Sequence, residues 1–257
     1  MEKTVRKSRE ESTDLPLFFK NPAPLDAERH ATAGLLTAPD FSFAANTNSI
    51  LVNAVEFYEA AKYYPIVFTQ AEMPVPAIMV GLEQDSYFVD ARGQWKEGTY
   101  IPGYARKYPF IFMSFPSRDD HILCIDEGAP QFKAGGGKGT LPLFQQNLPS
   151  DISSQALTFC GAYQREFMLT RSFCDAVQKA GLFEPMRFDV TLTGGREIHM
   201  AGFQAISEKK LQALPDATIL EFFKRGWLPL IYASLMSVSN WKSLAELAAK
   251  KKNTKAK

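Results

Sequence analysis

The sequence predicts a single α+β domain in which helices pack against a largely antiparallel sheet of six or more strands. Short apolar runs bounded by Pro, Gly or Asp fill the region from residue 66 to residue 125, as expected for strands covered on both faces. Links of hairpin length join these runs, which favours antiparallel pairing. Helical patterns follow over residues 151–180 and in the carboxy-terminal third, and such helices are expected to cover the sheet.

The composition excludes several classes of protein. The 257 residues are 46% hydrophobic and 22% charged, which excludes a disordered or coiled-coil chain. Three cysteines without CxxC spacing cannot build a disulfide framework, so a reducing compartment is expected. No apolar run approaches the roughly 18 residues of a membrane-spanning helix, and no export signal follows the charged residues 1–11. The predicted location is cytoplasmic, with the cell surface after export without a Sec signal as the alternative.

The charge distribution bears on possible partners. The formal net charge of +1 combines 29 basic with 28 acidic residues. Five of the lysines lie in residues 250–257, which are predicted to be a basic disordered tail. Without these five, 24 basic and 28 acidic residues leave a charge of −4 on residues 1–249. A nucleic-acid partner is therefore not expected; the alternative is that the lysine tail contacts nucleic acid or anionic lipid.

The first third of the chain predicts an arm, a helix and a series of strands. Residues 1–40 hold four of the sixteen prolines, and they are predicted to form an arm laid over a domain of residues 41–249. A helix is predicted over 49–64, where Ser49 can cap the start and Pro65 ends it. The strands predicted from apolar runs are Ile66–Phe68, Ala77–Leu82, Tyr87–Val89, Phe110–Met113 and Ile122–Ile125.

A weak internal repeat relates two of these strands. Residues 61–68 and 105–112 both contain a Tyr-Pro pair followed by an apolar strand, and each copy is followed by a second strand that ends in Asp. Two similar strand-pair units of one sheet would explain this repeat. The alternative is chance similarity between aromatic-rich strands.

The middle of the chain predicts a connection and a long helix. Residues 127–149 contain the glycine-rich segment 135–139 and three prolines, and they are predicted to be flexible. The glycines do not form a phosphate-binding loop, because Phe132 and Gly139 stand where glycine and a hydroxyl residue are needed. A helix over 151–180 is predicted next, capped by Ser150 or Asp151 and ended by Gly181.

A β-hairpin and two helices are predicted for the remainder. A three-residue loop of residues 194–196 would pair Leu192 with Ile198 and Val190 with Met200, which keeps the apolar side chains on one face. One helix is predicted to begin at Pro215 and to end at Gly226, and a last helix is opened by Pro229.

The stretch from Trp95 to Tyr108 concentrates aromatic, glycine and cationic residues. Rigid amphipathic rings dominate binding surfaces. We therefore predict that a ligand or a protein partner contacts the following residues: Trp95, Tyr100, Tyr104, Arg106 and Tyr108. The alternative is core packing of the rings, with the cations reaching outward to solvent.

Asp126 and Glu127, which follow the second repeat unit, form the best acidic pair and join the predicted binding residues. Adjacent carboxylates can serve as acid and base because crowding separates their pKa values. The alternative is that the two residues form a polar turn.

The three histidines, His30, His121 and His199, are spread over three segments, so no metal site is predicted. No cofactor motif or nucleophile motif is found, and none is predicted.

Several blocks between residues 22 and 245 resemble, in order and spacing, the bacterial SapC-like family. They are residues 40–45, Tyr64–Phe68, Tyr87–Asp90, the glycine- and aromatic-rich residues 93–104, Arg106–Phe110, Cys124–Glu127, Glu184–Met186 and Leu230–Ala233. One departure is Ser234, where a histidine is common in the family. The family name comes from a surface-layer context, and members occur beside genes for outer-membrane receptors and for proteins resembling flavin-dependent halogenases and cupin-type oxygenases.

The resemblance implies an accessory role in uptake or modification of a ligand or peptide. The first functional hypothesis is therefore a non-enzymatic binding or accessory protein. The second is a structural component of the surface layer or envelope, as the family name suggests. The third is an enzyme built around Asp126, Glu127, Arg106 and a tyrosine, which requires the acidic pair to lie beside Arg106.

Overall fold

The computed structural model describes residues 15–115, 118–192 and 195–255. The charged residues 1–11 and parts of two predicted turns, residues 116–117 and Gly194, lie outside the described residues. Every pair of neighbouring strands in the described residues is antiparallel, and helices pack beside them. The predicted α+β class with antiparallel pairing is confirmed. The strands form separate sheets, however, and the largest has five strands where a sheet of six or more is predicted.

The five-stranded sheet has the order β12-β13-β4-β5-β3. Its strands are β3 (Ser49–Leu51), β4 (Ile66–Thr69), β5 (Pro76–Met79), β12 (Phe183–Leu192) and β13 (Arg196–Ile206). The central strands β4 and β5 are almost wholly buried, which agrees with their continuous apolar sequences. Residues from distant parts of the chain thus share one sheet.

Smaller sheets bring the amino-terminal segment into the fold. β1 (Pro22–Pro24) pairs with β7 (Arg118–Asp126), which pairs in turn with β6 (Phe110–Phe115). β2 (Gly34–Leu36) lies between β8 (Phe132–Lys133) and β9 (Thr140–Pro142). A further pair joins β10 (Phe144–Gln145) to β11 (Leu148–Pro149). The predicted arm and the predicted connection 127–149 therefore pair with each other and with the domain through β1, β2, β8 and β9.

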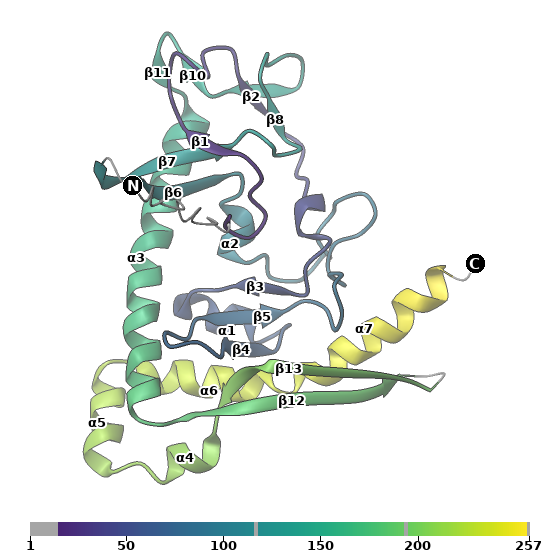
Figure 1. The fold of residues 1–257 in the computed structure, drawn as a ribbon, viewed down its shortest axis with the longest axis vertical. Coiled ribbons are helices and arrows are strands. Elements are labelled where there is room, and N and C mark those ends of the chain that lie inside the picture. Colours follow the sequence, from purple (N-terminus) through teal and green to yellow (C-terminus); the bar gives the residue numbers. More distant parts are fainter. Residues whose placement is uncertain (1–14, 116–117, 193–194, 256–257) are drawn as a thin grey trace, which may run out of the picture.

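The long helix α3 (Asp151–Lys179) runs along one side of the molecule past both the β6–β7 sheet and the five-stranded sheet (Figure 1). The predicted helix 151–180 is confirmed with these bounds. Shorter helices follow the hairpin, namely α4 (Glu208–Gln212), α5 (Asp216–Lys224), α6 (Trp227–Ser237) and α7 (Asn240–Lys255). Near β3 lie the short helices η1 (Ser42–Ala44), η2 (Ala54–Glu56), α1 (Phe57–Ala60) and α2 (Gly103–Arg106).

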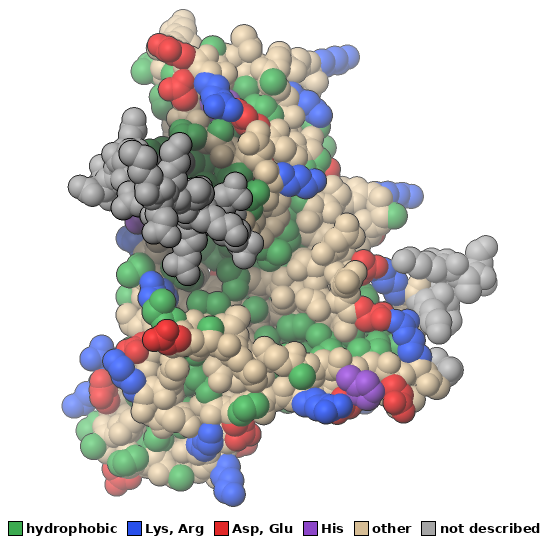
Figure 2. Space-filling model, viewed as in Figure 1, with side chains coloured by type: hydrophobic (Ala, Val, Ile, Leu, Met, Phe, Trp, Pro, Cys, Tyr) green, Lys and Arg blue, Asp and Glu red, His purple; other side chains and the backbone are tan. Residues whose placement is uncertain are grey.

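The main apolar core surrounds the five-stranded sheet, and α3 links it to a smaller core. Phe173 and Val177 of α3 are buried in the main core, whereas Cys160 of the same helix belongs to the smaller cluster with Phe110 and Ile125. On the face shown in Figure 2, hydrophobic side chains gather across the middle of the molecule, while charged side chains lie mostly toward its edges. One helix therefore contributes to both cores.

The predicted helix 49–64 is wrong at its start. Residues 49–51 form β3, paired with β5, and the helical residues begin only at Ala54. The helical pattern in the sequence does not reveal a strand pairing with residues 77–79, so the tertiary partner overrides the local preference. The predicted strand Tyr87–Val89 is reduced to an isolated bridge between Val89 and Trp95.

The hairpin of β12 and β13 has the predicted apolar face but a different register. Leu192 pairs with Arg196 and Val190 pairs with Ile198, so the loop consists of residues 193–195 and each partner is two positions earlier than predicted. A shift of two residues keeps the same side chains on each face because the strand period is two. Val190 and Ile198 consequently still share a face.

The carboxy-terminal helices differ from prediction at two places. The predicted last helix is broken into α6 and α7, because residues 238–239 form a turn between them. Helix α7 also continues to Lys255, into the segment predicted to be a disordered tail. Within it, Lys251 Nζ donates to the Ser86 carbonyl oxygen at 2.9 Å. No helix in the described residues is long and apolar enough to span a membrane.

The repeat corresponds to a shared local motif, not to units of one sheet. In each copy a short helix, α1 or α2, turns into a strand, β4 or β6, and the tyrosine of the Tyr-Pro pair is buried. β4 belongs to the five-stranded sheet and β6 to a three-stranded sheet. The prediction that both units share one sheet is therefore wrong.

Candidate functional site

The aromatic stretch 95–108 lies largely inside the protein. The side chains of Trp95, Tyr104 and Tyr108 are 8%, 5% and 6% exposed. Trp95 Nε1 donates to the Tyr64 hydroxyl at 3.2 Å, and that hydroxyl donates to the Tyr100 carbonyl oxygen at 2.5 Å. Burial raises the pKa of Tyr64 to about 12. Trp95 and Tyr108 thus stabilise the fold and do not form an open contact surface.

Tyr100 and Arg106 form a second cluster with Glu56, a residue that the sequence does not mark as functional. The Glu56 carboxylate accepts hydrogen bonds from the Tyr100 hydroxyl at 2.8 Å and from the backbone N–H of Gly103 at 2.6 Å. Arg106 donates to the Tyr100 hydroxyl at 3.1 Å and lies over the rings of Tyr100 and Phe159. Burial, followed by the charge of Glu56, raises the pKa of Tyr100 to about 12. The Tyr100 hydroxyl thus joins the Glu56 carboxylate to Arg106.

Asp126 is a fully buried acceptor that holds three loops together. Its carboxylate accepts from the backbone N–H groups of Lys20, Asn21 and Gly128 at 3.0, 2.7 and 3.0 Å. The Tyr108 hydroxyl also donates to it at 2.9 Å. Burial and then this carboxylate raise the pKa of Tyr108. Both carboxylate oxygens of Asp126 thus accept hydrogen bonds, as a buried carboxylate requires.

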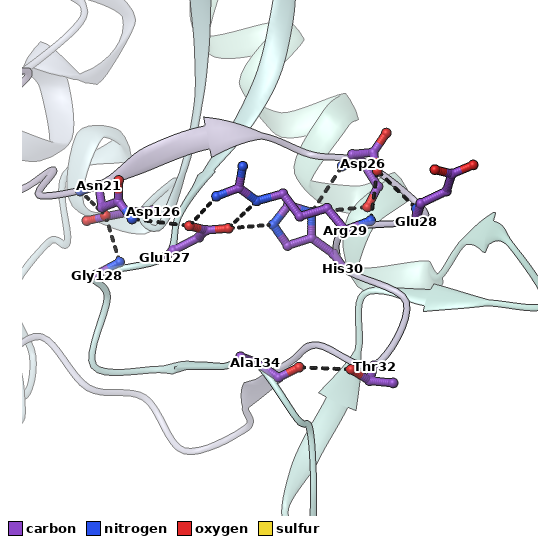
Figure 3. Close-up of polar contacts among 10 residues, drawn as sticks. All are labelled: Asn21, Asp26, Glu28, Arg29, His30, Thr32, Asp126, Glu127, Gly128 and Ala134. Atoms are coloured by element: carbon purple, nitrogen blue, oxygen red, sulfur yellow. Dashed lines mark hydrogen bonds and ion pairs between the residues drawn. The ribbon is translucent and has the colours of Figure 1, made fainter.

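Glu127 points away from Asp126, toward the amino-terminal segment (Figure 3). Arg29 donates to its two carboxylate oxygens at 2.6 and 2.7 Å. Asn21 Nδ2 lies at 3.1 Å from one of these oxygens and His30 Nε2 at 3.3 Å from the other. The hydrogen bond from Arg29 lowers the pKa of Glu127. Both acidic residues therefore tie the segment before and after β1 to the end of β7.

The structure does not bring the predicted catalytic set together. The polar contacts of Arg106 are with Ile101 and Tyr100, whereas Asp126 contacts Tyr108 and Glu127 contacts Arg29. Within the described part of the chain, no group of three His, Cys, Asp or Glu side chains is arranged to hold a metal ion. The acidic pair is consequently a poor candidate for acid–base catalysis at this site.

Lys107 has a more unusual environment than any of the predicted site residues. This side chain is 5% exposed, and its Nζ atom has no hydrogen-bond partner among the described residues. It lies 4.2, 4.9 and 5.5 Å from the ring centres of Tyr104, Phe19 and Tyr163. Aromatic faces attract a cation, but they do not supply the acceptors that a buried ammonium group requires.

Lys107 lines a cavity of about 150 Å³, which we call the Lys107 pocket. Tyr104, Lys107 and Cys160 are its buried lining residues. Leu51, Ile111, Gln164 and Phe167 also line it and are partly exposed, so the pocket reaches the protein surface. Its walls come from β3, α2, β6 and α3. The pocket therefore lies where α3 passes from one sheet to the other.

The ionisable groups of the Lys107 pocket are shifted by burial. Burial lowers the pKa of Lys107 to about 8. It raises the pKa of Cys160 to about 11, an effect that the Lys107 charge opposes, and raises the pKa values of Tyr104 and Tyr163. At neutral pH the pocket thus contains an ammonium group beside a neutral thiol and neutral phenols. A protonated, buried thiol is a weak nucleophile.

The sequence offers no signal that would single out Lys107. In the primary structure it is a cation between Arg106 and Tyr108, and in the core-packing alternative for this stretch the cations reach outward to solvent. Arg106 does so, being exposed. Lys107 is covered by Tyr163 and Cys160 of α3 and by Phe19, residues more than fifty positions away in either direction. Its burial is therefore a tertiary property.

Comparison with known proteins gives a family. Residues 25–244 match the SapC family, and this match covers most of the chain. The chain belongs to the SapC family. The predicted resemblance is thereby confirmed, and it includes the residues of the Lys107 pocket. No curated protein and no solved structure matches this SapC-family chain.

Proposed function

We propose that this SapC-family chain is a non-enzymatic binding protein and that the Lys107 pocket is its ligand site. The observation that carries the proposal is a buried ammonium group without a hydrogen-bond partner, on a residue that lines a cavity with partly exposed walls. Leaving such a group unpaired costs free energy, and a bound ligand would supply the missing acceptor. Ligand sites are typically apolar cavities with a few polar groups of this kind.

The chemistry of the pocket favours binding over catalysis. The thiol of Cys160 is protonated at neutral pH because burial raises its pKa to about 11. The acidic residues Asp126 and Glu127 are satisfied by loop and arginine donors elsewhere. An accessory role in uptake or modification of a ligand, which the family resemblance implies, is compatible with a protein that binds without transforming its ligand.

The test blocks the pocket at its mouth. Gln164 lines the pocket from α3 and is partly exposed, so Gln164→Trp should fill the entrance without disturbing the core. Gln155→Trp, at an exposed position of the same helix outside the pocket, is the matched control. Ligand-detected NMR with benzoate, benzamide and benzyl alcohol should show binding to the wild type and to the control, and loss of binding in Gln164→Trp. Absence of binding by all three compounds, or equal binding to both variants, would contradict the proposal.

A second candidate function is self-association as a structural component of the envelope. Large apolar side chains are exposed on α5 and α6, namely Leu220, Phe223, Tyr232 and Met236, which are 51%, 68%, 51% and 73% exposed. Exposed apolar area of this kind favours protein–protein contact. Light scattering over a range of concentrations tests this candidate. A monomer at every concentration, with no change on Phe223→Glu, would remove it.

A further inference from the structure

We propose that the ligand of the Lys107 pocket is a monocarboxylate whose apolar body is about the size of one aromatic ring. This inference rests on the proposed binding function and assigns the chemical class of the ligand. It follows from the charge that is unpaired, from the number of donors in the pocket and from the size of the cavity.

The unpaired group selects an anion. Lys107 Nζ lacks an acceptor. It lies 4.2 to 5.5 Å from the centres of the surrounding aromatic rings. A charge-assisted hydrogen bond to a carboxylate is roughly twice as strong as a neutral one. A neutral acceptor would leave the buried positive charge uncompensated, whereas a carboxylate neutralises it.

The number of donors selects a single negative charge. Lys107 is the only cationic side chain among the described residues that line the pocket, and the other donors there, the Gln164 amide and the hydroxyls of Tyr104 and Tyr163, are neutral. One ammonium group balances one carboxylate. A phosphate monoester carries nearly two charges, and the second charge would remain unpaired in these apolar surroundings.

The size and lining of the cavity select the body of the ligand. A cavity of about 150 Å³ holds one benzene-sized ring, as engineered apolar cavities of that volume do. Leu51, Ile111, Phe112 and Phe167 supply apolar walls, and the Tyr104 and Tyr163 rings flank the amine. The ligand therefore places its ring among these side chains and its carboxylate on Lys107.

The first experiment compares matched compounds and variants. Benzoate and benzamide have nearly the same shape and differ in charge, so titration calorimetry at pH 7 should show about tenfold tighter binding of benzoate to the wild type. In Lys107→Met this preference should vanish while benzamide still binds. Lys242→Met, at an exposed lysine of α7, should keep the preference. Circular dichroism establishes that each variant is folded.

The second experiment uses the wild type alone and so does not depend on a variant. In the protein without ligand the pKa of Lys107 is about 8, and pairing with a carboxylate raises it. Benzoate binding therefore takes up a proton, and the affinity falls as the pH rises from 8 to 9.5. Benzamide binding should not change. The other ionisable groups facing the amine are Tyr104 from α2 and Cys160 and Tyr163 from α3, and these stay protonated over this range. The Phe19 segment, β3 and β6 present Phe19, Leu51, Ile111 and Phe112, which do not titrate.

The outcomes separate this inference from the proposed function. Equal affinities for benzoate and benzamide, with both lost in Gln164→Trp, would overturn the carboxylate assignment and leave the binding function standing. Failure of every compound to bind would overturn both. A borohydride-reducible adduct of benzaldehyde on Lys107, with no preference for benzoate, would replace the carboxylate with a carbonyl ligand.

Discussion

At the scale of single residues, Asp126 and Glu127 are neighbours in sequence with opposite environments. Asp126 is 0% exposed and accepts from backbone N–H groups and the Tyr108 hydroxyl. Glu127 retains 17% exposure of its side chain and binds Arg29, whose side chain is 55% exposed. The two carboxylates should therefore contribute very differently to stability.

Asp126→Asn is expected to lower the free energy of unfolding by about 2–4 kcal/mol, because an amide nitrogen replaces one of the accepting oxygens and leaves buried donors unpaired. Glu127→Gln, the matched change at the next position, should cost less than about 1 kcal/mol, as exposed ion pairs do. Urea unfolding followed by circular dichroism measures both. Equal effects of the two substitutions would contradict a structural role for Asp126.

A dependence on pH follows from Glu127. The hydrogen bond from Arg29 lowers the pKa of this carboxyl from its ordinary value of 4.5. A depressed pKa in the folded state adds stability that is present above pH 4.5 and is lost as the pH falls through the folded-state pKa. Unfolding midpoints in urea between pH 6 and pH 3 should therefore fall more steeply for the wild type than for Arg29→Gln. Parallel profiles would show that the Arg29 contact does not stabilise the charged form.

At the scale of elements, a buried hydroxyl of α3 contacts the backbone of the helical turn η2. Thr170 Oγ1 accepts from the backbone N–H of Ala54 at 2.8 Å and donates to the Glu166 carbonyl oxygen at 2.7 Å. Thr158 lies on an exposed face of α3 and makes only the bond within the helix, from its hydroxyl to the Ser154 carbonyl oxygen at 3.0 Å. The two threonines thus differ by one tertiary hydrogen bond.

Thr170→Val keeps the shape of the side chain and leaves the Ala54 N–H without its acceptor, so we expect a loss of about 1–3 kcal/mol in the free energy of unfolding. Thr158→Val should change it by less than about 0.5 kcal/mol. Chemical denaturation of both variants provides the comparison. A loss in Thr158→Val as large as that in Thr170→Val would show that the intrahelical bond, not the contact with η2, is what matters.

At the scale of the whole molecule, α3 contributes side chains to two apolar cores. Cys160 packs with Phe110 in the smaller core, and Phe173 packs in the main core. All three tryptophans of the chain, Trp95, Trp227 and Trp241, pack in or against the main core. Their fluorescence therefore follows only one of the two regions, whereas far-ultraviolet circular dichroism follows the helices and sheets of both.

We expect one cooperative unfolding transition, with the same urea midpoint by tryptophan fluorescence and by circular dichroism, because melting of α3 removes packing from both cores. A fluorescence transition that is displaced from the circular dichroism transition would show that the sheet containing β6 and β7 unfolds independently. The experiment requires no substitution, since the tryptophans already lie in one core.

Much of the fold can be predicted from local patterns in the sequence. The helix 151–180, the strands 66–68 and 122–125 and the same-face placement of Val190 and Ile198 follow from apolar patterns that the structure retains. The register of the hairpin could not be predicted from the sequence, because a shift of two residues leaves every side chain on the same face of the sheet. β3 and the short strand β2 were missed, because their extended form depends on partners far away in sequence, β5 for the first and β8 and β9 for the second.

The sequence by itself determined the antiparallel α+β class and the family, because these depend on apolar periodicity and on the order of short blocks along the chain. It also drew attention to the stretch 95–108, which supplies Tyr104 and Lys107 to the candidate site. Only the tertiary structure decided which side chains of that stretch are satisfied and which one is not. Burial and hydrogen bonding depend on residues brought near in space, and here α3 places Tyr163 and Cys160 over Lys107 while the loops around β1 enclose Asp126.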